Sequence, residues 1–204
     1  MTRMVMPIDR ESLVNMLRNP GVPSSDFDLN RAFQPKSTTP LRPAGVLIPI
    51  RETSEGLRLI LTKRSSALKH HPGQIAFPGG RVDPGDRNHI DAALREAHEE
   101  IGLPAAQVEV LGELPTHQTV TQFEMFPVLG WVSGDFTAVA ELGEVSEIFD
   151  VPLAHVLNPE NFRIQSRRWR GQMRSFYTVP YGPYYIWGAT ARILRGLAER
   201  AVQA

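Results

Sequence analysis

The chain has 204 residues, the size of one domain with room for an appendage, and roughly 70% of its unfolded surface is expected to be buried on folding. Apolar residues make up 42% and charged residues 22%, which excludes wholesale disorder, and 22 basic against 22 acidic side chains leave no positive excess for non-specific nucleic-acid binding. The absence of cysteine excludes disulfides, thiolate metal sites and a cysteine nucleophile, and it fits a reducing compartment.

Residues 1–43 differ in composition from the rest of the chain. Asp9 suits the N-cap of a short helix, and prolines and glycines then interrupt a polar stretch. The apolar positions of this helix are Leu13, Val14, Met16 and Leu17. We predict a helical arm and extended lead-in at 1–43, packed on a body at 44–204. The first 14 residues hold no apolar core of signal-peptide length, and no stretch approaches the 18 apolar residues of a membrane span, so we expect a cytoplasmic protein with no membrane partner.

The body begins with two apolar, β-branched runs, 44–50 and 57–63, which we predict to pair as a hairpin. A loop rich in glycine and proline follows at 70–86. After it comes the most regular helix of the sequence, with Asn88 as its N-cap and Gly102 directly after its last apolar position.

The second half of the body predicts strands around one further helix. Two strands are expected at 108–114 and 125–132, and 145–157 is expected to be a helical turn that runs into a strand or a second helix. A hairpin is predicted around Gly171, and an amphipathic helix at 184–202. Strands mixed with two regular helices, without βαβ alternation, indicate an α+β fold, as an α/β/α sandwich with a mixed sheet.

The helix between Asn88 and Gly102 has one apolar and one acidic side. At about 100° per residue its apolar positions fall within one arc of about 100°, the width of a stripe that faces a core. These positions are Ile90, Ala93, Leu94, Ala97 and Ile101. Glu96, Glu99 and Glu100 fall within a second such arc, so the three carboxylates are neighbours along one edge.

Three like charges at these spacings oppose helix formation by roughly 0.2–0.5 kcal/mol per pair. This repulsion is relieved if the acidic face is well solvated or if a cation binds to the carboxylates. Hard divalent cations such as Mg²⁺ prefer carboxylate oxygens and share their remaining positions with substrate phosphates. Arg95 is placed to pair with these acids and orient them. Because a bare E-x-x-E-E pattern is more often a solvated face, the surrounding residues decide.

The surrounding sequence resembles the Nudix box, G-x5-E-x7-R-E-U-x-E-E-x-G-U, in which U is bulky and apolar. The matching residues are Gly80 for the opening glycine and then Arg95, Glu96, Glu99, Glu100, Gly102 and Leu103, with Ala97 at the bulky position. A chance match to R-E-x-x-E-E-x-G is on the order of one in ten thousand. Two features depart from the box: the first acid is Asp86 rather than Glu, and eight residues rather than seven separate it from Arg95.

A second motif, upstream of the box, resembles the coenzyme A pyrophosphatase branch of the Nudix hydrolases. Residues 60–80 are similar to L-L-T-x-R-[SA]-x3-R-x3-G-x3-F-P-G-G, with Ile60 at the first leucine and Lys69 at the second arginine. Residues 144–153 and 188–190 are similar to later stretches of the same branch.

The resemblance implies the Nudix fold and hydrolysis, with Mg²⁺ or Mn²⁺, of the pyrophosphate in coenzyme A or its acyl or oxidised derivatives. The products would be adenosine 3′,5′-bisphosphate and 4′-phosphopantetheine. By matched position Glu96, Glu99, Glu100 and the Gly80 carbonyl are the metal ligands, and Arg95 orients them. Glu99, Glu100 and Arg95 are thereby the candidate catalytic residues.

The general base is left between a box glutamate and a loop acid, Glu144 or Glu147. Alternatively, Glu144 and Glu147 are surface acids on a helical turn and have no catalytic role. Arg64, Lys69 and Arg81 are the candidates for binding substrate phosphates, and the fork of an arginine suits the 3′-phosphate of coenzyme A.

Two alternatives to this function remain. The same chemistry would serve ADP-ribose, NADH or a nucleotide sugar, and the fold would also suit a non-catalytic module that senses nucleotides or binds a protein. The expected partner is a small molecule like coenzyme A. A homodimer stays open, because large aromatic side chains more often belong to a core or a dimer surface than to an adenine site. These are Trp131, Trp169, Trp187, Tyr184 and Tyr185.

Overall fold

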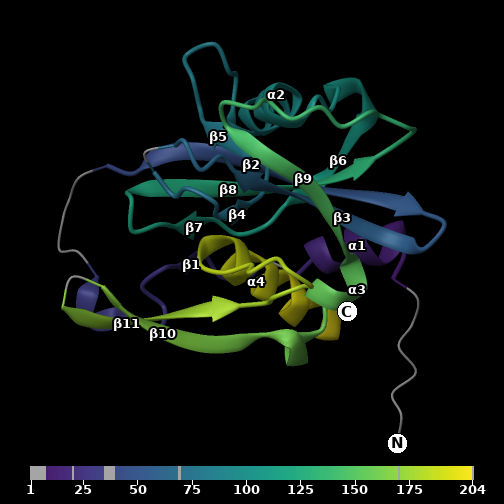
Figure 1. Cartoon of the computed structure of the whole chain (residues 1–204). Helices are drawn as coiled ribbons and strands as arrows, with labels where there is room; N and C mark the ends of the chain where they lie inside the picture. Colours follow the sequence, from purple (N-terminus) through teal and green to yellow (C-terminus); the bar gives the residue numbers. More distant parts are fainter. Residues whose placement is uncertain (1–7, 20, 35–39, 69, 170, 204) are drawn as a thin grey trace, which may run out of the picture.

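A computed structural model describes residues 8–19, 21–34, 40–68, 70–169 and 171–203. Helix α2 (His89–Ile101) lies on one face of a central sheet, and helices α1 (Arg10–Leu17) and α4 (Ala189–Gln203) lie on the other (Figure 1). A hairpin of β10 (Arg163–Trp169) and β11 (Gln172–Thr178) lies beyond α4. The predicted α+β sandwich is confirmed.

The central sheet is mixed, as predicted. β2 (Arg42–Thr53) pairs antiparallel with β3 (Gly56–Arg64), which is the predicted hairpin, and parallel with β8 (Phe123–Val132). β9 (Val145–Pro152) pairs with β3, and β5 (Gly79–Arg81) pairs with the beginning of β2. The other strands of this sheet are β1 (Ser24–Ser25), β4 (Ile75–Ala76), β6 (Val108–Glu113) and β7 (His117–Gln118).

The strands build one apolar core on each face of the sheet, because successive side chains point to opposite faces. Leu59 and Leu61 of β3 enter the larger core on the α4 side, and Ile60 between them enters the smaller core on the α2 side. Ala93 and Ala97 of the predicted apolar stripe are fully buried in the smaller core. Because the apolar stripe of α2 faces the sheet, this packing fixes the direction in which the acidic edge of the helix points.

Helix α2 has the predicted ends and packs unusually close to β2. Asn88 Oδ1 accepts the N–H groups of Ile90 and Asp91, each at 3.0 Å, and Gly102 ends the helix in the left-handed region at φ 71°. A Cβ at Gly45 of β2 would overlap the carbonyl oxygen in the first turn of α2. The helix can therefore approach the sheet this closely only because position 45 is glycine.

The N-terminal helix is confirmed and packs on the body. Asp9 Oδ1 accepts the N–H of Ser12 at 2.8 Å, and Leu13 and Met16 are buried in the core on the α4 side. Strand β2 begins at Arg42, two residues before the predicted start of the body, and β1 adds a short parallel strand from the lead-in. The lead-in thus contributes to the sheet.

Two predicted elements differ from the structure. Segment 145–157 forms β9 first and then the short helix α3 (Leu153–Val156), so the predicted helical turn at its start was wrong. Phe149 and Ile148 enter cores on opposite faces of the sheet, which is the alternation of a strand. The helix predicted over 184–202 begins only at residue 189, after Gly188 at φ 67°.

The remaining predicted elements are present. The strands expected at 108–114 and 125–132 are β6 and β8, and the hairpin around position 171 is β10–β11. Short 3-10 helices occur at Arg31–Phe33, Ala105–Gln107 and Pro159–Asn161. Within the described ranges, none of the helices combines the length and the apolar character needed to cross a membrane.

Candidate active site

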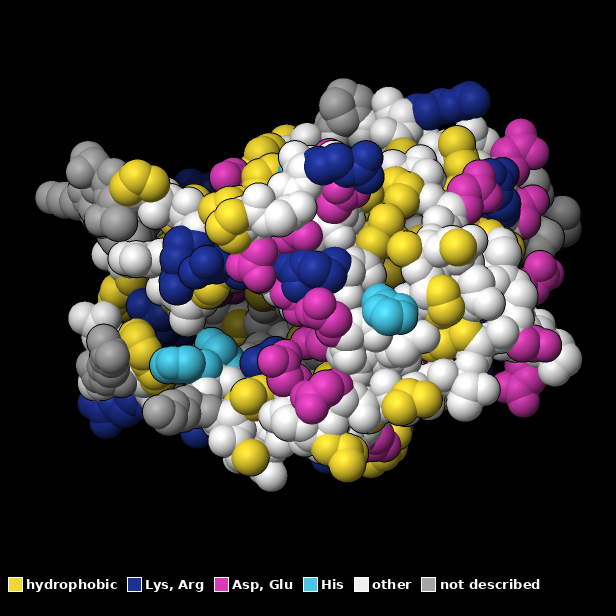
Figure 2. All heavy atoms as spheres, turned by 90° about the horizontal axis from the view of Figure 1, so that it is seen from above, with side chains coloured by type: hydrophobic (Ala, Val, Ile, Leu, Met, Phe, Trp, Pro, Cys, Tyr) yellow, Lys and Arg dark blue, Asp and Glu magenta, His cyan; other side chains and the backbone are white. Residues whose placement is uncertain are grey.

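The acidic edge of α2 lies on an open face of the molecule. Figure 2 shows this face: acidic side chains gather in its middle together with lysine or arginine side chains, beside a hollow with histidine side chains on its rim. Arg95, Glu96, Glu99 and Glu100 all lie in the second half of α2. The apolar stripe of the helix turns this half of its acidic edge toward the glycines of β5.

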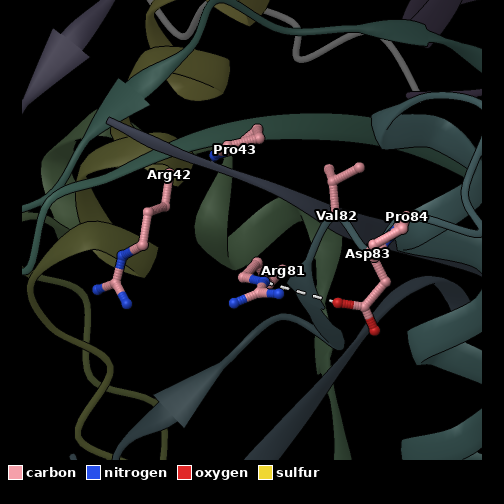
Figure 3. Close-up of a pocket in the computed structure, with 6 residues that line it drawn as sticks. All are labelled: Arg42, Pro43, Arg81, Val82, Asp83 and Pro84. Atoms are coloured by element: carbon pink, nitrogen blue, oxygen red, sulfur yellow. Dashed lines mark ion pairs between the residues drawn. The ribbon is translucent and has the colours of Figure 1, made fainter. Parts of the chain in front are cut away.

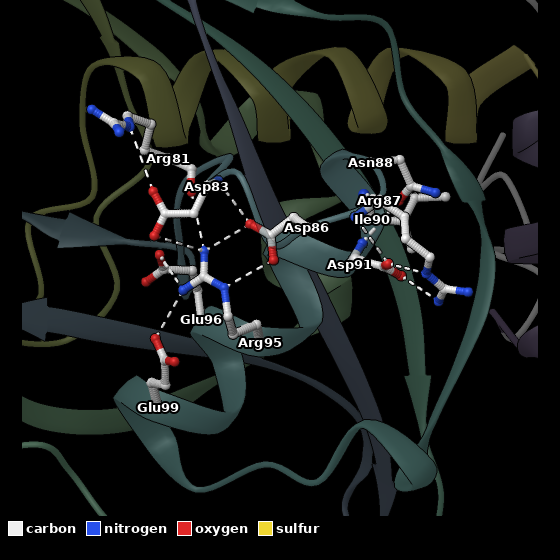
Figure 4. A network of polar contacts seen from close by, with 10 residues as sticks. All are labelled: Arg81, Asp83, Asp86, Arg87, Asn88, Ile90, Asp91, Arg95, Glu96 and Glu99. Carbon is white, nitrogen blue, oxygen red and sulfur yellow. Dashed lines mark hydrogen bonds and ion pairs between the residues drawn. The ribbon is translucent and has the colours of Figure 1, made fainter.

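Arg95 is the centre of a polar network (Figure 4). Its Nε and Nη2 donate to the two carboxylate oxygens of Asp86, both at 3.0 Å, and Nη2 also donates to the carbonyl oxygen of Arg81 at 3.1 Å. Its Nη1 donates to Glu96 Oε1 and Glu99 Oε2, both at 2.9 Å. All five N–H donors of the guanidinium thus have an acceptor. The hydrogen bond to Asp86 is the largest of several effects that raise the pKa of Arg95.

Asp86 is the residue that stands in place of the first glutamate of the box. Only 6% of its side chain is exposed, and the fork of Arg95 holds its pKa below the usual range. A tight turn carries it: the N–H of Asp83 donates to Asp86 Oδ2 at 2.8 Å, and the N–H of Asp86 donates to the carbonyl of Asp83 at 2.9 Å. This turn holds the acid in the position where Arg95 binds it.

Glu100 is the buried acid of the site, with 4% of its surface exposed. Its Oε2 accepts the N–H of Gly79 at 3.0 Å. Gly79 has φ 153°, and a Cβ there would lie 2.5 Å from the carbonyl oxygen of Gly45, so only glycine fits this contact. Burial raises the pKa of Glu100 to about 7, although the Gly79 hydrogen bond and the charge of Arg64 oppose the rise.

Glu96 lies against the other glycine of β5. A Cβ at Gly80 would overlap the Glu96 carboxylate, so the glycine leaves room for this side chain. Burial is the largest effect on Glu96 and raises its pKa, while the hydrogen bond from Arg95 works against it. The Gly80 position, predicted to offer a carbonyl to a metal, thus borders a predicted metal ligand.

The predicted metal ligands fit a divalent cation by their chemistry. Three carboxylates and a backbone carbonyl form an all-oxygen donor set, which hard cations prefer. In the described part of the chain, however, no three acidic or histidine side chains converge as a metal site would require. Arg95 holds Glu96 and Glu99, and Glu100 is turned to Gly79. Two of the three carboxylates would have to turn away from Arg95 to meet at one cation.

The two candidate loop bases lie in different surroundings. Glu144 is exposed in the turn before β9, and its charge raises the pKa of both buried glutamates of α2. Glu147 lies within β9 and shares a face with Phe149, on the α4 side of the sheet. There Glu147 Oε1 accepts the hydroxyl of Tyr184 at 2.6 Å, a contact that nothing in the sequence indicated. Neither acid lies on the helical turn that the sequence predicted.

The candidate phosphate-binding residues are spread around the site. Arg64, at the end of β3, is partly buried, and its positive charge works against the rise in the pKa of Glu100. Arg81, at the end of β5, is exposed, and its Nε lies 3.6 Å from Asp83 Oδ1. Lys69 falls outside the described residues.

Comparisons with known proteins identify the family of the chain. Residues 41–170 match the NUDIX domain family. The protein named Nudix hydrolase NudL of Enterobacter sp. (strain 638) is 41% identical over 175 residues, which cover 85% of this chain and 90% of that protein. NudL of Escherichia coli (strain K12 / DH10B) is 42% identical over the same shares.

Solved structures agree on the fold. The MutT protein from Methanosarcina mazei Go1 has a TM-score of 0.50 at 18% identity, over 82% of this chain and 97% of its own. The MutT/nudix family protein from Enterococcus faecalis has a TM-score of 0.50 at 15% identity, over 97% of this chain and 76% of its own. With relatives above 40% identity named as hydrolases, the alternative of a non-catalytic module is set aside. The chain belongs to the Nudix hydrolase family and is a pyrophosphohydrolase of small-molecule substrates that works with a divalent metal ion.

Proposed function

We propose that this Nudix hydrolase cleaves the pyrophosphate of coenzyme A or its acyl or oxidised derivatives, with Mg²⁺ or Mn²⁺ as the metal. One observation carries the proposal. The charge of Arg64, the arginine of the motif that resembles the coenzyme A branch, works against the rise in the pKa of buried Glu100. A cationic residue of the substrate motif that interacts with the metal-binding acids would suit a phosphate that shares the metal.

The residues would divide the work as follows. Glu96, Glu99 and Glu100 would hold the cation, which would neutralise charge on the substrate phosphates and activate water. Asp86 fixes Arg95, and Arg95 orients Glu96 and Glu99. Arg64 binds a phosphate of the substrate. The general base is either a glutamate of α2 or Glu144, since Glu147 is engaged with Tyr184 on the other side of the sheet.

The competing proposal keeps the same chemistry and changes the substrate. ADP-ribose, NADH and nucleotide sugars carry the same pyrophosphate, so the acids of α2 would serve them equally. What favours coenzyme A is the match of residues 60–80 to the branch motif. Neither that motif nor Arg64 would be needed for metal binding alone.

Product analysis tests the proposal. Coenzyme A is incubated with the protein and Mn²⁺, and mass spectrometry follows the products, with a chelator as the control. We expect adenosine 3′,5′-bisphosphate and 4′-phosphopantetheine in equal amounts, and none with the chelator. A higher kcat/KM for ADP-ribose, NADH or a nucleotide sugar than for coenzyme A would contradict the substrate assignment and leave the family assignment intact.

A further inference from the structure

A pocket opens at the end of the sheet, beside the Arg95 network. Its volume is about 380 Å³, which lies within the range of small-molecule sites. It is lined by Arg42, Pro43, Arg81, Val82, Asp83 and Pro84. Figure 3 shows the side chains of Arg42, from the beginning of β2, and Arg81, from β5, reaching into the same space. No motif in the sequence singles out Arg42.

Arg42 is held in place by an aromatic ring and, in the described part of the chain, by one hydrogen bond. Its guanidinium lies 4.0 Å from the centroid of the Phe123 ring, and its Nη2 donates to the carbonyl of Thr121 at 2.9 Å. Among the described residues its other N–H groups have no acceptor. A flat guanidinium that is fixed on an aromatic ring loses little freedom when it binds an anion.

The pocket has more positive than negative charge. Arg81 has only the ion pair with Asp83, at 3.6 Å, among the residues that the structure describes. The Asp83 carboxylate is itself shared with Arg95, whose Nη2 lies 3.9 Å away. Two guanidiniums therefore face one shared carboxylate. The walls between them are apolar, from Pro43, Val82 and Pro84. Such a pocket suits an anionic group that is attached to a less polar ring.

The pocket is separated from the acids of α2 by a single guanidinium. The carbonyl oxygen of Arg81 accepts Arg95 Nη2 at 3.1 Å, while Arg95 Nη1 binds Glu96 and Glu99. An anion in the pocket is thus not the group that shares the metal. We propose that Arg42 and Arg81 bind a phosphate monoester on the nucleotide half of the substrate, which in coenzyme A is the 3′-phosphate, an inference that rests on the proposed function.

The test compares coenzyme A with dephospho-coenzyme A, which lacks only this phosphate. We expect Arg42→Ala to lower the ratio of kcat/KM for coenzyme A to that for dephospho-coenzyme A about tenfold, the effect of one lost charge-assisted hydrogen bond. The loss should appear in KM rather than kcat, because the group is remote from the reacting bond. Arg42→Lys keeps the charge without the fork, so its ratio of kcat/KM values should lie between those of the wild type and Arg42→Ala. Arg167→Ala, on exposed β10, is the matched control and should leave the ratio unchanged.

A second arm measures binding without turnover. Calorimetry compares adenosine 3′,5′-bisphosphate with AMP on the wild type and on Arg42→Ala, and melting temperatures confirm that the variants fold. A preference for the bisphosphate that Arg42→Ala removes supports the inference. Equal losses for both substrates, an unchanged ratio, or equal affinity of the wild type for the two nucleotides overturn it. If the wild type cleaves neither coenzyme, the proposed function fails, and the binding arm alone decides the phosphate site.

Discussion

Arg95 alone connects three acids of the site, because its guanidinium binds Asp86, Glu96 and Glu99. The guanidinium neutralises Glu96 and Glu99, so these like charges coexist on one helix edge without a metal. Sequence reasoning predicted the orienting role of Arg95 from its place beside the acids. It assigned no role to Asp86, because only the folded loop brings this acid to the fork of Arg95. The Glu147 contact with Tyr184 depends on packing across 37 residues and has no local pattern.

The raised pKa of Glu100 predicts how stability depends on pH without metal. The pKa rises from the ordinary 4.5 to about 7 in the folded protein, so between these values the folded state binds more protons than the unfolded state. Stability therefore falls as the pH rises through this window, by about 3 kcal/mol for a shift of this size. Glu100→Gln removes the charge and should abolish most of this loss. Urea unfolding of both proteins at pH 5 and pH 8, in the presence of a chelator, measures the loss in the free energy of unfolding.

Exposed Glu52 supplies the control for this titration. Glu52→Gln should keep the full loss of stability between pH 5 and pH 8, because its carboxylate is solvated in both states. Added Mg²⁺ should restore the stability of the wild type at pH 8, since a nearby cation favours the carboxylate. If Glu100→Gln lost stability with pH as the wild type does, Glu100 would not be the group responsible.

At the scale of elements, a close helix–sheet contact positions the site. The start and end of α2 were predictable because its caps and apolar stripe are local features of the sequence. Its closeness to β2 depends on Gly45, which is 43 residues from Asn88 in a different element. β9 was mistaken for a helical turn because a short run of mixed polarity fits both periods, and pairing with β3 decided between them.

Gly45→Ala should separate α2 from the sheet. The added Cβ would overlap backbone atoms of α2, which cannot rotate away as a side chain would, so we expect a loss of about 3 kcal/mol in the free energy of unfolding. Activity should fall with it, because Gly79 contacts both Gly45 and Glu100. Gly85→Ala is the control, since a Cβ there meets nothing within 4 Å. Equal unfolding curves for the two variants would refute this role of Gly45.

At the scale of the molecule, the sheet brings together residues that no local pattern connects. The layers of the fold were predictable from the sequence, because it mixes apolar strands with two amphipathic helices. The two-residue strands β1 and β7 and the Arg42–Arg81 pocket did not follow. They depend on which strands become neighbours: Ala44 of β2 pairs with Arg81 of β5 only in the folded sheet. The site motif was readable in the sequence, and its surroundings were not.

The central claim, that the acids of α2 hold the divalent cation that hydrolysis needs, is tested most directly by Mn²⁺ titration followed by electron paramagnetic resonance. Glu99 is the most exposed of the three acids, with 56% of its side chain accessible, so Glu99→Gln should fold normally. We predict that Glu99→Gln weakens Mn²⁺ binding at least tenfold and removes nearly all hydrolysis of coenzyme A, whereas Glu52→Gln changes neither. Equal Mn²⁺ affinity in the wild type and Glu99→Gln would contradict the account.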